Sequence, residues 1–201
     1  MNEPDVARAG RKRVSSRAML EEAACELFLE NTYAGTTIEQ IAARAGVSRN
    51  TFFNYFDAKS DVLWAGVDDA IDALTQSLAA HADGQDALAA VRTVLIGAAT
   101  WFGPGQLPLA VTQYDVMGAQ DELKTSGLPR FLRLADAVVR FLAAGTKEIN
   151  PDAARAKVIA FALVAAVAAA GSAWAGAGPA RHPLSEYVAE AITPICRGFT
   201  R

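Results

Sequence analysis

Residues 36–61, TTIEQIAARAGVSRNTFFNYFDAKSD, constrain the fold of this chain more than any other stretch. Their spacing predicts two short helices that meet at Gly46, because glycine adopts the left-handed conformation of such a turn at little cost. Two short helices joined by a tight turn are the layout of a helix-turn-helix, which places its second helix in the major groove of DNA. The stretch therefore indicates both a local fold and a class of partner.

Residues that start helices support this layout. Thr36 with Glu39, and Thr37 with Gln40, have the spacing of a capping box, so either threonine can cap the first helix. Ser48 is expected to cap the second helix. Each helix of the motif thus has its own start signal.

The second helix is expected to bury one face and expose the other. Phe52 and Phe56 are four residues apart and share the buried face. On the exposed face, Arg49 can bind guanine or a phosphate, and Asn50 and Asn54 can bond adenine edges or phosphates. A helical bundle with an ordinary polar face is the alternative, but spacing, caps and aromatic pair together favour nucleic-acid binding. The residues of this helix predicted to contact DNA are Ser48, Arg49, Asn50, Thr51, Phe53 and Asn54.

A basic arm precedes these helices, although the whole chain has a net charge of −3. Arg8, Arg11, Lys12, Arg13 and Arg17 fall together with no acid among them. Such arms commonly follow the phosphates of DNA, and a solvated terminus without a partner is the alternative. Arg13 and Arg17 are included among the predicted DNA contacts.

The rest of the chain has the pattern of helices, with no alternation of apolar and polar residues bounded by hairpin turns. The prediction is an all-α fold of about nine helical segments, separated by glycine and proline breaks that include Ser126-Gly127. The first helix is expected from near Ser16 to Asn31. The fourth is expected from Ala58 to about His81, which places Lys59 in its first turn, where the helix dipole disfavours a cation unless an anionic partner binds it.

Several classes of function lack a signal in this sequence. The polar N-terminus lacks the apolar core of a signal peptide, and Cys25 and Cys196 sit in apolar helical patterns, so we expect the cytoplasm and no disulfide. His81 and His182 are isolated from carboxylates and thiols, so no metal site is expected. No nucleophile, phosphate-loop, zinc-protease or dinucleotide motif is present, so neither an enzyme nor a cofactor is expected.

The sequence TTIEQIAARAGVSRNTFFNYFDAKSDVL resembles the N-terminal signature of the tetracycline-repressor (TetR) family of transcriptional regulators. The resemblance is specific over about residues 15–65 and only architectural beyond. It implies an all-α homodimer that represses transcription from a palindromic operator and leaves it when a small, largely apolar effector binds. By position, Thr37, Tyr55 and Lys59 would hold phosphates, and residues 48–54 would supply groove contacts.

The resemblance also implies how the chain is divided. We expect a basic flexible arm at 1–14, a helix-turn-helix DNA-binding domain at 15–60, and a helical ligand-binding and dimerisation domain at 61–201. One residue departs from the family pattern, because Phe53 stands where tyrosine is most frequent. Without the hydroxyl a phosphate bond is lost, which leaves Phe53 to pack against sugar or a thymine methyl.

The segment VIAFALVAAVAAAGSAWAGA, residues 158–177, carries no charge and is long enough to cross a bilayer. We reject a membrane span, because alanine and glycine dominate the segment and it lacks a basic flank of the orienting kind. In the TetR family the last two helices form a four-helix bundle with their copies, and small side chains suit such close approach; a core helix within one chain is the alternative. The predicted dimer interface comprises Val158, Ala162, Ala166, Ala170, Trp174, Tyr187, Val188, Ala191 and Ile195.

A ligand pocket is expected on the helices that surround it in the family. Pockets are mostly apolar with a few polar groups, but so is a core with a buried tyrosine, and core packing is favoured for any single residue. The predicted pocket residues are Trp101, Phe102, Gln113, Tyr114, Met117, Phe131, Val138, Phe141 and Phe161.

A helical adaptor that binds proteins rather than DNA is the competing function. An adaptor would show no salt dependence with DNA, whereas the dimeric regulator would bind a two-fold symmetric duplex in a salt-dependent way. The sequence favours the ligand-responsive DNA-binding regulator, whose partners are double-stranded DNA, a small-molecule effector and a second copy of the chain.

Overall fold

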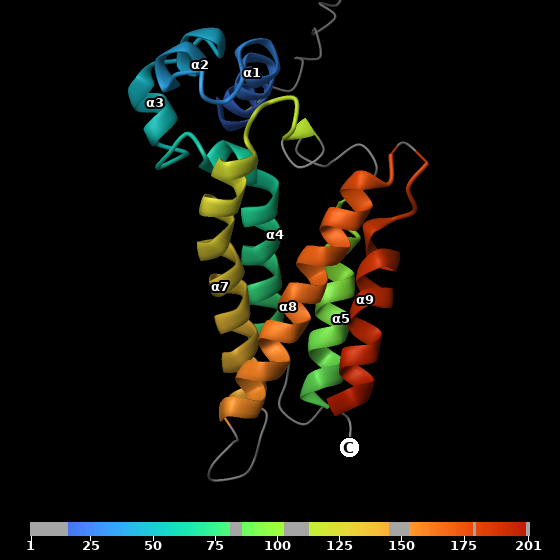
Figure 1. The fold of residues 1–201 in the computed structure, drawn as a ribbon. Coiled ribbons are helices and arrows are strands. Elements are labelled where there is room, and N and C mark those ends of the chain that lie inside the picture. The colour runs from blue at the N-terminus through green and yellow to red at the C-terminus, as the bar shows by residue number, and fades with distance from the viewer. Residues whose placement is uncertain (1–15, 81–85, 103–112, 145–152, 179, 200–201) are drawn as a thin grey trace, which may run out of the picture.

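The computed structural model describes residues 16–80, 86–102, 113–144, 153–178 and 180–199. All regular secondary structure in these ranges is helical, so the predicted all-α fold is confirmed (Figure 1). Against the predicted number of about nine, the described residues form eight α-helices. They are α1 (Ser16–Asn31), α2 (Ile38–Arg44), α3 (Arg49–Phe53), α4 (Asp61–Ala80), α5 (Ala87–Ala99), α7 (Gln120–Ala144), α8 (Ala153–Gly176) and α9 (Leu184–Phe199).

The first three helices pack around one small apolar core. Helix α1 has the predicted bounds and buries Leu20, Leu27 and Phe28 on one face. Phe52 of α3 and the following Phe56 close this core, with 0% and 5% of their surface exposed and their ring centroids 5.4 Å apart. The predicted aromatic pair therefore anchors the second helix of the motif.

The structure decides between the two threonines that could cap α2. Thr37 is the cap: its Oγ1 accepts a hydrogen bond from the Gln40 N–H at 3.2 Å, and Gln40 Oε1 accepts one from the Thr37 N–H at 2.8 Å. Thr36 is buried instead, and its hydroxyl donates a hydrogen bond to the Leu27 carbonyl oxygen at 3.1 Å. Gln40, and not Glu39, is therefore the residue that completes the capping box.

The turn between α2 and α3 has the predicted geometry. Gly46 has a φ of 69°, in the left-handed region that other residues rarely adopt. Ser48 caps α3, since its Oγ accepts a hydrogen bond from the Thr51 N–H at 3.1 Å. The turn thus fixes the angle at which α3 leaves α2.

The predicted start of the fourth helix at Ala58 is wrong, because α4 begins at Asp61. The Asp61 carboxylate accepts a hydrogen bond from the Ala58 N–H at 2.7 Å, and the Asp61 N–H donates to the Ala58 carbonyl at 3.1 Å. These bonds close a turn before the helix. Lys59 therefore lies outside the first turn of α4, and the dipole argument for an anionic partner does not apply to it.

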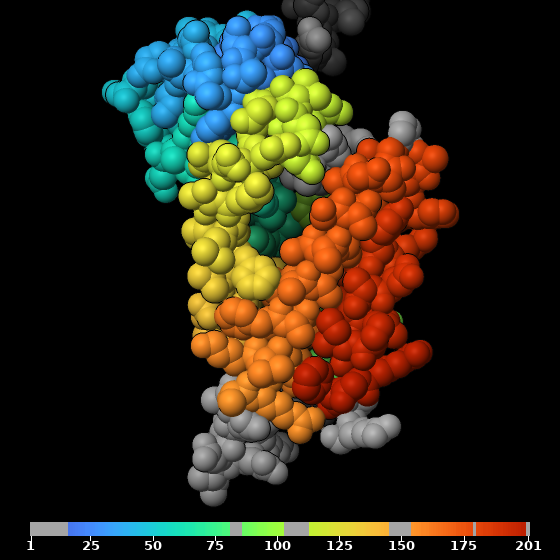
Figure 2. Space-filling model, viewed as in Figure 1, coloured from blue at the N-terminus to red at the C-terminus, as the bar shows by residue number. Residues whose placement is uncertain are grey.

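Helix α4 contributes to two cores. Val62 and Leu63 in its first turn pack with α1–α3, while Ile71 and Leu74 pack with the C-terminal helices. The C-terminal core is a bundle in which α8 contacts α7 and α9, α5 contacts α9 and α4, and α4 contacts α7. Figure 2 shows α8 and α9 side by side on one face of the molecule. Because side chains of α4 belong to both cores, a displacement of this helix as a unit would affect both of them.

Helix α7 runs through the break predicted at Ser126-Gly127. A Cβ added to Gly127 would lie 3.1 Å from the Trp64 ring, so the missing side chain makes room for that indole. Trp64 Nε1 also donates a hydrogen bond to Ser126 Oγ at 2.7 Å. The glycine therefore serves close packing of α4 on α7 and does not interrupt the helix.

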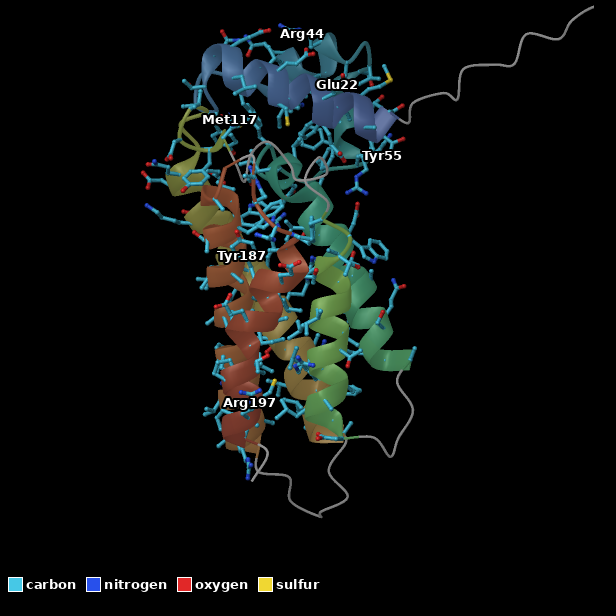
Figure 3. All side chains as sticks on the ribbon, turned by 90° about the vertical axis from the view of Figure 1, so that its right-hand side faces the viewer. Glu22, Arg44, Tyr55, Met117, Tyr187 and Arg197 are labelled. Carbon is cyan, nitrogen blue, oxygen red and sulfur yellow. The ribbon has the colours of Figure 1, made fainter. Side chains whose placement is uncertain are left out.

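A segment far along the chain completes the N-terminal core. Met117 is fully buried in the same cluster as the side chains of α1 and α3, together with Ala119. Its carbonyl accepts a hydrogen bond from the Tyr33 N–H at 2.7 Å. Figure 3 shows Met117 between the N-terminal helices and the bundle. The core of the predicted domain 15–60 thus extends to residues that follow it in sequence.

In the part of the chain that the structure describes, one helix is long and apolar enough to cross a membrane. Residues Ala154–Gly176 of α8 have a mean hydropathy of 2.1, and 33% of the most apolar stretch is buried. Core helices of soluble proteins pass the same test. Here the helix packs against α7 and α9.

Candidate nucleic-acid interface

The predicted base-contacting side chains lie on the outward face of α3 and the turn after it. Arg49, Asn50 and Asn54 are exposed, and so are the large aromatic side chains of Phe53 and Tyr55, at 39% and 46%. Helices α1–α3 form one end of the molecule, beyond the ends of α4 and α7 (Figure 1). Polar and aromatic groups are thus gathered on one outward surface, which can meet the base edges of a groove.

Arg49 is held by two neighbours on this surface. Its Nε lies 2.6 Å from Glu39 Oε1 of α2, and its guanidinium lies 4.9 Å from the centroid of the Phe53 ring. Glu39 was not singled out for the interface from the sequence, where its spacing from Thr36 suggested a capping partner. The opposite charges of Glu39 and Arg49 were the available signal.

The short hydroxyl side chains of the motif have local roles. Thr37 and Ser48 are exposed caps, while Thr51 is half-buried, with its Oγ1 2.9 Å from Ser48 Oγ. These contacts hold the starts of α2 and α3 on the outward surface. Contact of the three residues with DNA remains a prediction.

Lys59 has partners within the chain. Its Nζ donates hydrogen bonds to the carbonyl oxygens of Tyr33 and Thr36, both at 2.7 Å, and lies 4.0 Å from the centroid of the Tyr33 ring. Burial lowers the pKa of Lys59 and raises the pKa of Tyr33 to about 12. An ammonium has three N–H donors, so one remains for the predicted phosphate contact.

Arg17 joins α1 to α4. Its Nε lies 3.0 Å from Glu21, its Nη1 lies 3.0 Å from Asp69, and its Nη2 donates to the Ala65 carbonyl at 3.2 Å. A phosphate would compete with these partners, so the geometry gives Arg17 a structural role beside its predicted one. Arg13 lies outside the described residues, as do the other basic residues of the arm.

Arg44 is a residue of this end that the sequence did not single out. It bridges α2 to α1 through Glu26 and Glu30, at 3.0 and 2.8 Å. Hydrogen bonds from Arg44 lower the pKa of Glu30. These exposed ion pairs join the end of α2 to α1 and, being exposed, contribute little to stability.

The predicted pocket residues lie in several different surroundings, and their contact with a ligand stays a prediction. Met117 belongs to the N-terminal core, and Trp101 is 62% exposed. Val138 is fully buried in the C-terminal core, where the rings of Phe131 and Phe161 meet edge to face, their centroids 5.8 Å apart. The other four are exposed or half-buried, namely Phe102, Gln113, Tyr114 and Phe141.

A cleft of about 620 Å³ lies between α1, the turn before α4, α4 itself and α7. None of the predicted pocket residues lines it. Its walls carry five aspartates and three arginines, so it differs from the largely apolar site expected for an effector. The charged residues are Arg17, Asp57, Asp61, Asp68, Asp69, Asp72, Arg130 and Arg133.

The predicted dimer residues divide into two groups. Ala170, Trp174 and Val188 are at most 5% exposed inside the subunit, so within this chain they pack into the core, and their place in a dimer interface stays a prediction. Apolar residues lie on all sides of α8, so its sequence did not show which face packs inside the subunit. Val158 is 57% exposed. The remaining residues are half-buried, namely Ala162, Ala166, Tyr187, Ala191 and Ile195.

Among the residues that the structure describes, no group of three or more histidine, cysteine, aspartate or glutamate side chains could hold a metal ion. Cys25 and Cys196 are both free thiols, and burial raises the pKa of Cys25 to about 11. The outward face of α3 carries hydrogen-bond donors, the Arg49 guanidinium and aromatic rings, and such groups suit recognition of a polar surface.

Known proteins share this arrangement. Residues 20–65 match the model of the family described as bacterial regulatory proteins, tetR family. MftR of Mycobacterium tuberculosis, named for transcriptional regulation of mycofactocin biosynthesis, is 31% identical over 61 residues. That match covers 30% of this chain and 31% of MftR, so the chain matches about a third of the length of this curated relative.

Solved structures resemble the whole described fold. NalD of Pseudomonas aeruginosa, the secondary repressor of the MexAB-OprM multidrug efflux pump, has a TM-score of 0.61 at 20% identity, covering 91% of this chain and 96% of NalD. SmeT of Stenotrophomonas maltophilia, in complex with triclosan, has a TM-score of 0.58 at 22% identity, covering 91% and 90%. FadR of Thermus thermophilus, in complex with lauroyl-CoA, has a TM-score of 0.55 at 21% identity, covering 92% and 95%.

At these identities the solved structures establish a common fold, and the N-terminal helices carry the closer relationship. The matched residues contain the capped helices, the left-handed Gly46 and the buried Phe52 described above. Residues 20–65 thus match the N-terminal domain of the tetR family of bacterial regulatory proteins, and beyond them the likeness is one of fold.

Proposed function

We propose that the protein is a transcriptional repressor that binds a palindromic operator as a homodimer and leaves it when a small, largely apolar effector binds the C-terminal helices. The observation that carries DNA binding is the outward face of α3. It exposes Arg49, Asn50, Phe53 and Asn54 above a closed apolar core. Arginine and asparagine are the side chains that read guanine and adenine edges in the major groove, so this face can select a sequence.

Two ligands seen in related folds support an apolar effector. SmeT was solved with triclosan and T. thermophilus FadR with lauroyl-CoA, and large parts of both molecules are apolar. In this chain the aromatic contact between Phe131 and Phe161 lies at the edge of the C-terminal core, where an apolar ligand would be surrounded by apolar side chains. The helices α4 and α7 connect that core to the DNA-binding end, so an effector there can bias the position of α3.

The open face of α8 supports the dimer. Residues 158–176 carry no charge, and Val158, Ala165, Ala168 and Ala169 are exposed on a helix beside α9 (Figure 2). Small side chains let a second helix approach closely, and pairing with a partner's α8 and α9 would cover this apolar surface. The same proposal places the protein in the cytoplasm as a non-enzymatic regulator without a membrane span.

Selection from a library of random duplexes tests the DNA-binding proposal. The purified full-length protein is expected to enrich a two-fold symmetric sequence, with half-sites about one helical turn or a multiple of it apart. Fluorescence anisotropy with the enriched duplex should show that the logarithm of the affinity falls linearly with the logarithm of salt concentration. A protein that enriches no sequence and shows no salt dependence would instead fit the helical adaptor.

A thermal-shift screen tests the effector. Small molecules that bind only the folded protein raise its melting temperature. We expect apolar compounds to be enriched among those that do, and the same compounds to release the selected duplex in the anisotropy assay. Compounds that stabilise the protein without releasing DNA would argue against effector-controlled repression.

A further inference from the structure

Glu39 and Arg49 form an ion pair across the exposed surface of α2 and α3. Glu39 Oε1 lies 2.6 Å from Arg49 Nε, and the two side chains are 62% and 57% exposed. Exposed ion pairs contribute little to stability, so stability alone does not explain this contact. A carboxylate beside a surface that meets DNA phosphates also opposes binding, so general affinity for DNA does not explain the position of Glu39 either.

The pair leaves Arg49 with a defined set of donors. Glu39 contacts the guanidinium at Nε, and the guanidinium carbon Cζ lies over the Phe53 ring, 4.9 Å from its centroid. In a planar guanidinium, a carboxylate bound at Nε leaves the end formed by Nη1 and Nη2 as a pair of parallel donors. Guanine presents O6 and N7 in the major groove, and two parallel donors match this pair of acceptors.

Phe53 lies beside Arg49 and can contact the neighbouring base pair. When an arginine binds guanine end-on, its guanidinium lies near the plane of the base. Because Phe53 lies beside that guanidinium, its ring can reach the next base pair, which is about 3.4 Å along the strand. Phenylalanine contacts the methyl group of thymine there, and Phe53 has no hydroxyl with which to bind a phosphate instead.

We propose that Glu39 is a positioning residue that holds Arg49 for end-on contact with a guanine, and that Phe53 reads the methyl of a thymine in the adjacent base pair. The operator class is thus a palindrome whose half-sites each contain a guanine–thymine neighbour. This inference rests on the DNA-binding function proposed above.

Glu39 has a second effect, on DNA of other sequences. The hydrogen bond from its own backbone N–H and the charge of Arg49 lower the pKa of Glu39, so the carboxylate is ionised at neutral pH. A negative charge next to Arg49 repels phosphates and discourages the arginine from turning to the DNA backbone. Specificity is a difference between two affinities, and this charge lowers the unwanted one.

The test uses duplex selection with the full-length wild type and three variants, Glu39→Gln, Arg49→Ala and Phe53→Ala. The affinity of each is then measured by anisotropy, at one salt concentration, for the duplex that the wild type selects and for a scrambled duplex. We expect Arg49→Ala to lose the guanine preference and Phe53→Ala to lose only the thymine preference. Glu39→Gln should weaken the guanine preference and reduce the ratio of specific to scrambled affinity by on the order of tenfold, partly by tightening scrambled binding.

Glu30→Gln is the matched control for the loss of one exposed carboxylate. Glu30 also forms an ion pair, with Arg44, and its side chain is 52% exposed, but it lies on α1 away from Arg49. The control should select the wild-type sequence at the wild-type affinity ratio. A merely structural role for Glu39 would lower the melting temperature without changing the selected sequence, and that result would overturn the inference.

The possible failures are distinguishable. A wild type that enriches a palindrome without a guanine–thymine neighbour overturns the inference and leaves the repressor proposal standing. The same conclusion follows if Glu39→Gln selects the wild-type sequence with an unchanged affinity ratio. A wild type with no enriched sequence and no salt-dependent affinity overturns the proposed function, and the inference with it.

Discussion

Met117 shows how a single side chain can join two parts of this molecule. It is fully buried among the side chains of α1 and α3, yet it belongs to the segment 113–119, which comes just before α7. The bond from the Tyr33 N–H to its carbonyl fixes the backbone on both sides of the contact, and Gly118 turns the chain back with a φ of 61°. Any shift of this segment is therefore transmitted to the core beneath α3.

Substituting Met117 by alanine is expected to destabilise the N-terminal end. Removing a fully buried methionine side chain leaves a cavity and costs about 2–5 kcal/mol of unfolding free energy. Val116 is the control, because its side chain is 62% exposed and Val116→Ala should change stability by less than about 0.5 kcal/mol. Urea unfolding followed by circular dichroism measures both. Equal stability of the two variants would mean that Met117 contributes nothing to this core.

Helices α4 and α7 are joined by a charged contact centred on Arg130. The side chain is 14% exposed, and its Nη2 lies 2.9 Å from Asp61 and 2.7 Å from Asp68 of α4. Its Nη1 donates to the Ser126 carbonyl at 2.8 Å, and the guanidinium lies 5.3 Å from the centroid of the Trp64 ring. This contact, with the close approach at Gly127, makes the two helices one unit between the two cores.

Arg130→Met is expected to weaken this unit. The substitution keeps an apolar stem of similar length but removes the guanidinium shared by Asp61 and Asp68, which are 26% and 23% exposed. Loss of one member of a buried charge cluster costs roughly 3–5 kcal/mol, and partial exposure here reduces the expectation to about 2 kcal/mol. Arg133→Met is the matched control, because Arg133 also contacts Asp68 but is 47% exposed, so its loss should cost under about 1 kcal/mol. If urea unfolding gives equal values, the Arg130 contact does not hold α4 to α7.

At the scale of the whole molecule, the uncovered surface of α8 is the feature that the single chain does not explain. One side of this helix packs against α7 and α9 through residues such as Leu163 and Trp174, while the other side exposes small apolar residues. Water-exposed apolar surface of this kind is favourable to cover, and a symmetric pair of subunits covers it twice. A dimer would also set the distance between two copies of α3 for two half-sites.

Ala165→Glu tests this assembly. Ala165 is exposed on α8, so a charge there should leave the subunit folded but disfavour burial against a partner. Ala89→Glu on α5 is the matched control, since Ala89 is also an exposed helical alanine. Sedimentation velocity should give a dimer for the wild type and Ala89→Glu, and monomer for Ala165→Glu at micromolar concentration. A dimer for all three proteins would place the interface elsewhere.

The sequence by itself determined the local features of the DNA-binding end. The capping box, the left-handed Gly46, the Ser48 cap and the Phe52–Phe56 pair were all predicted, and the structure has each of them. Their physical causes act within one or two helical turns, so neighbouring letters contain the necessary information. The outward position of Arg49 and Asn54 follows from the same periodicity.

The tertiary structure decided what depends on partners distant in the chain. From the sequence, Gly127 was predicted to break a helix. In the structure it packs against Trp64, which is 62 residues away from the neighbouring Ser126. The burial of Met117 and the loss of Ala170 from the available surface depend in the same way on which helices pack together. Local sequence patterns indicate which secondary structure a residue favours, but a packing contact contributes free energy only when the fold brings its two surfaces together.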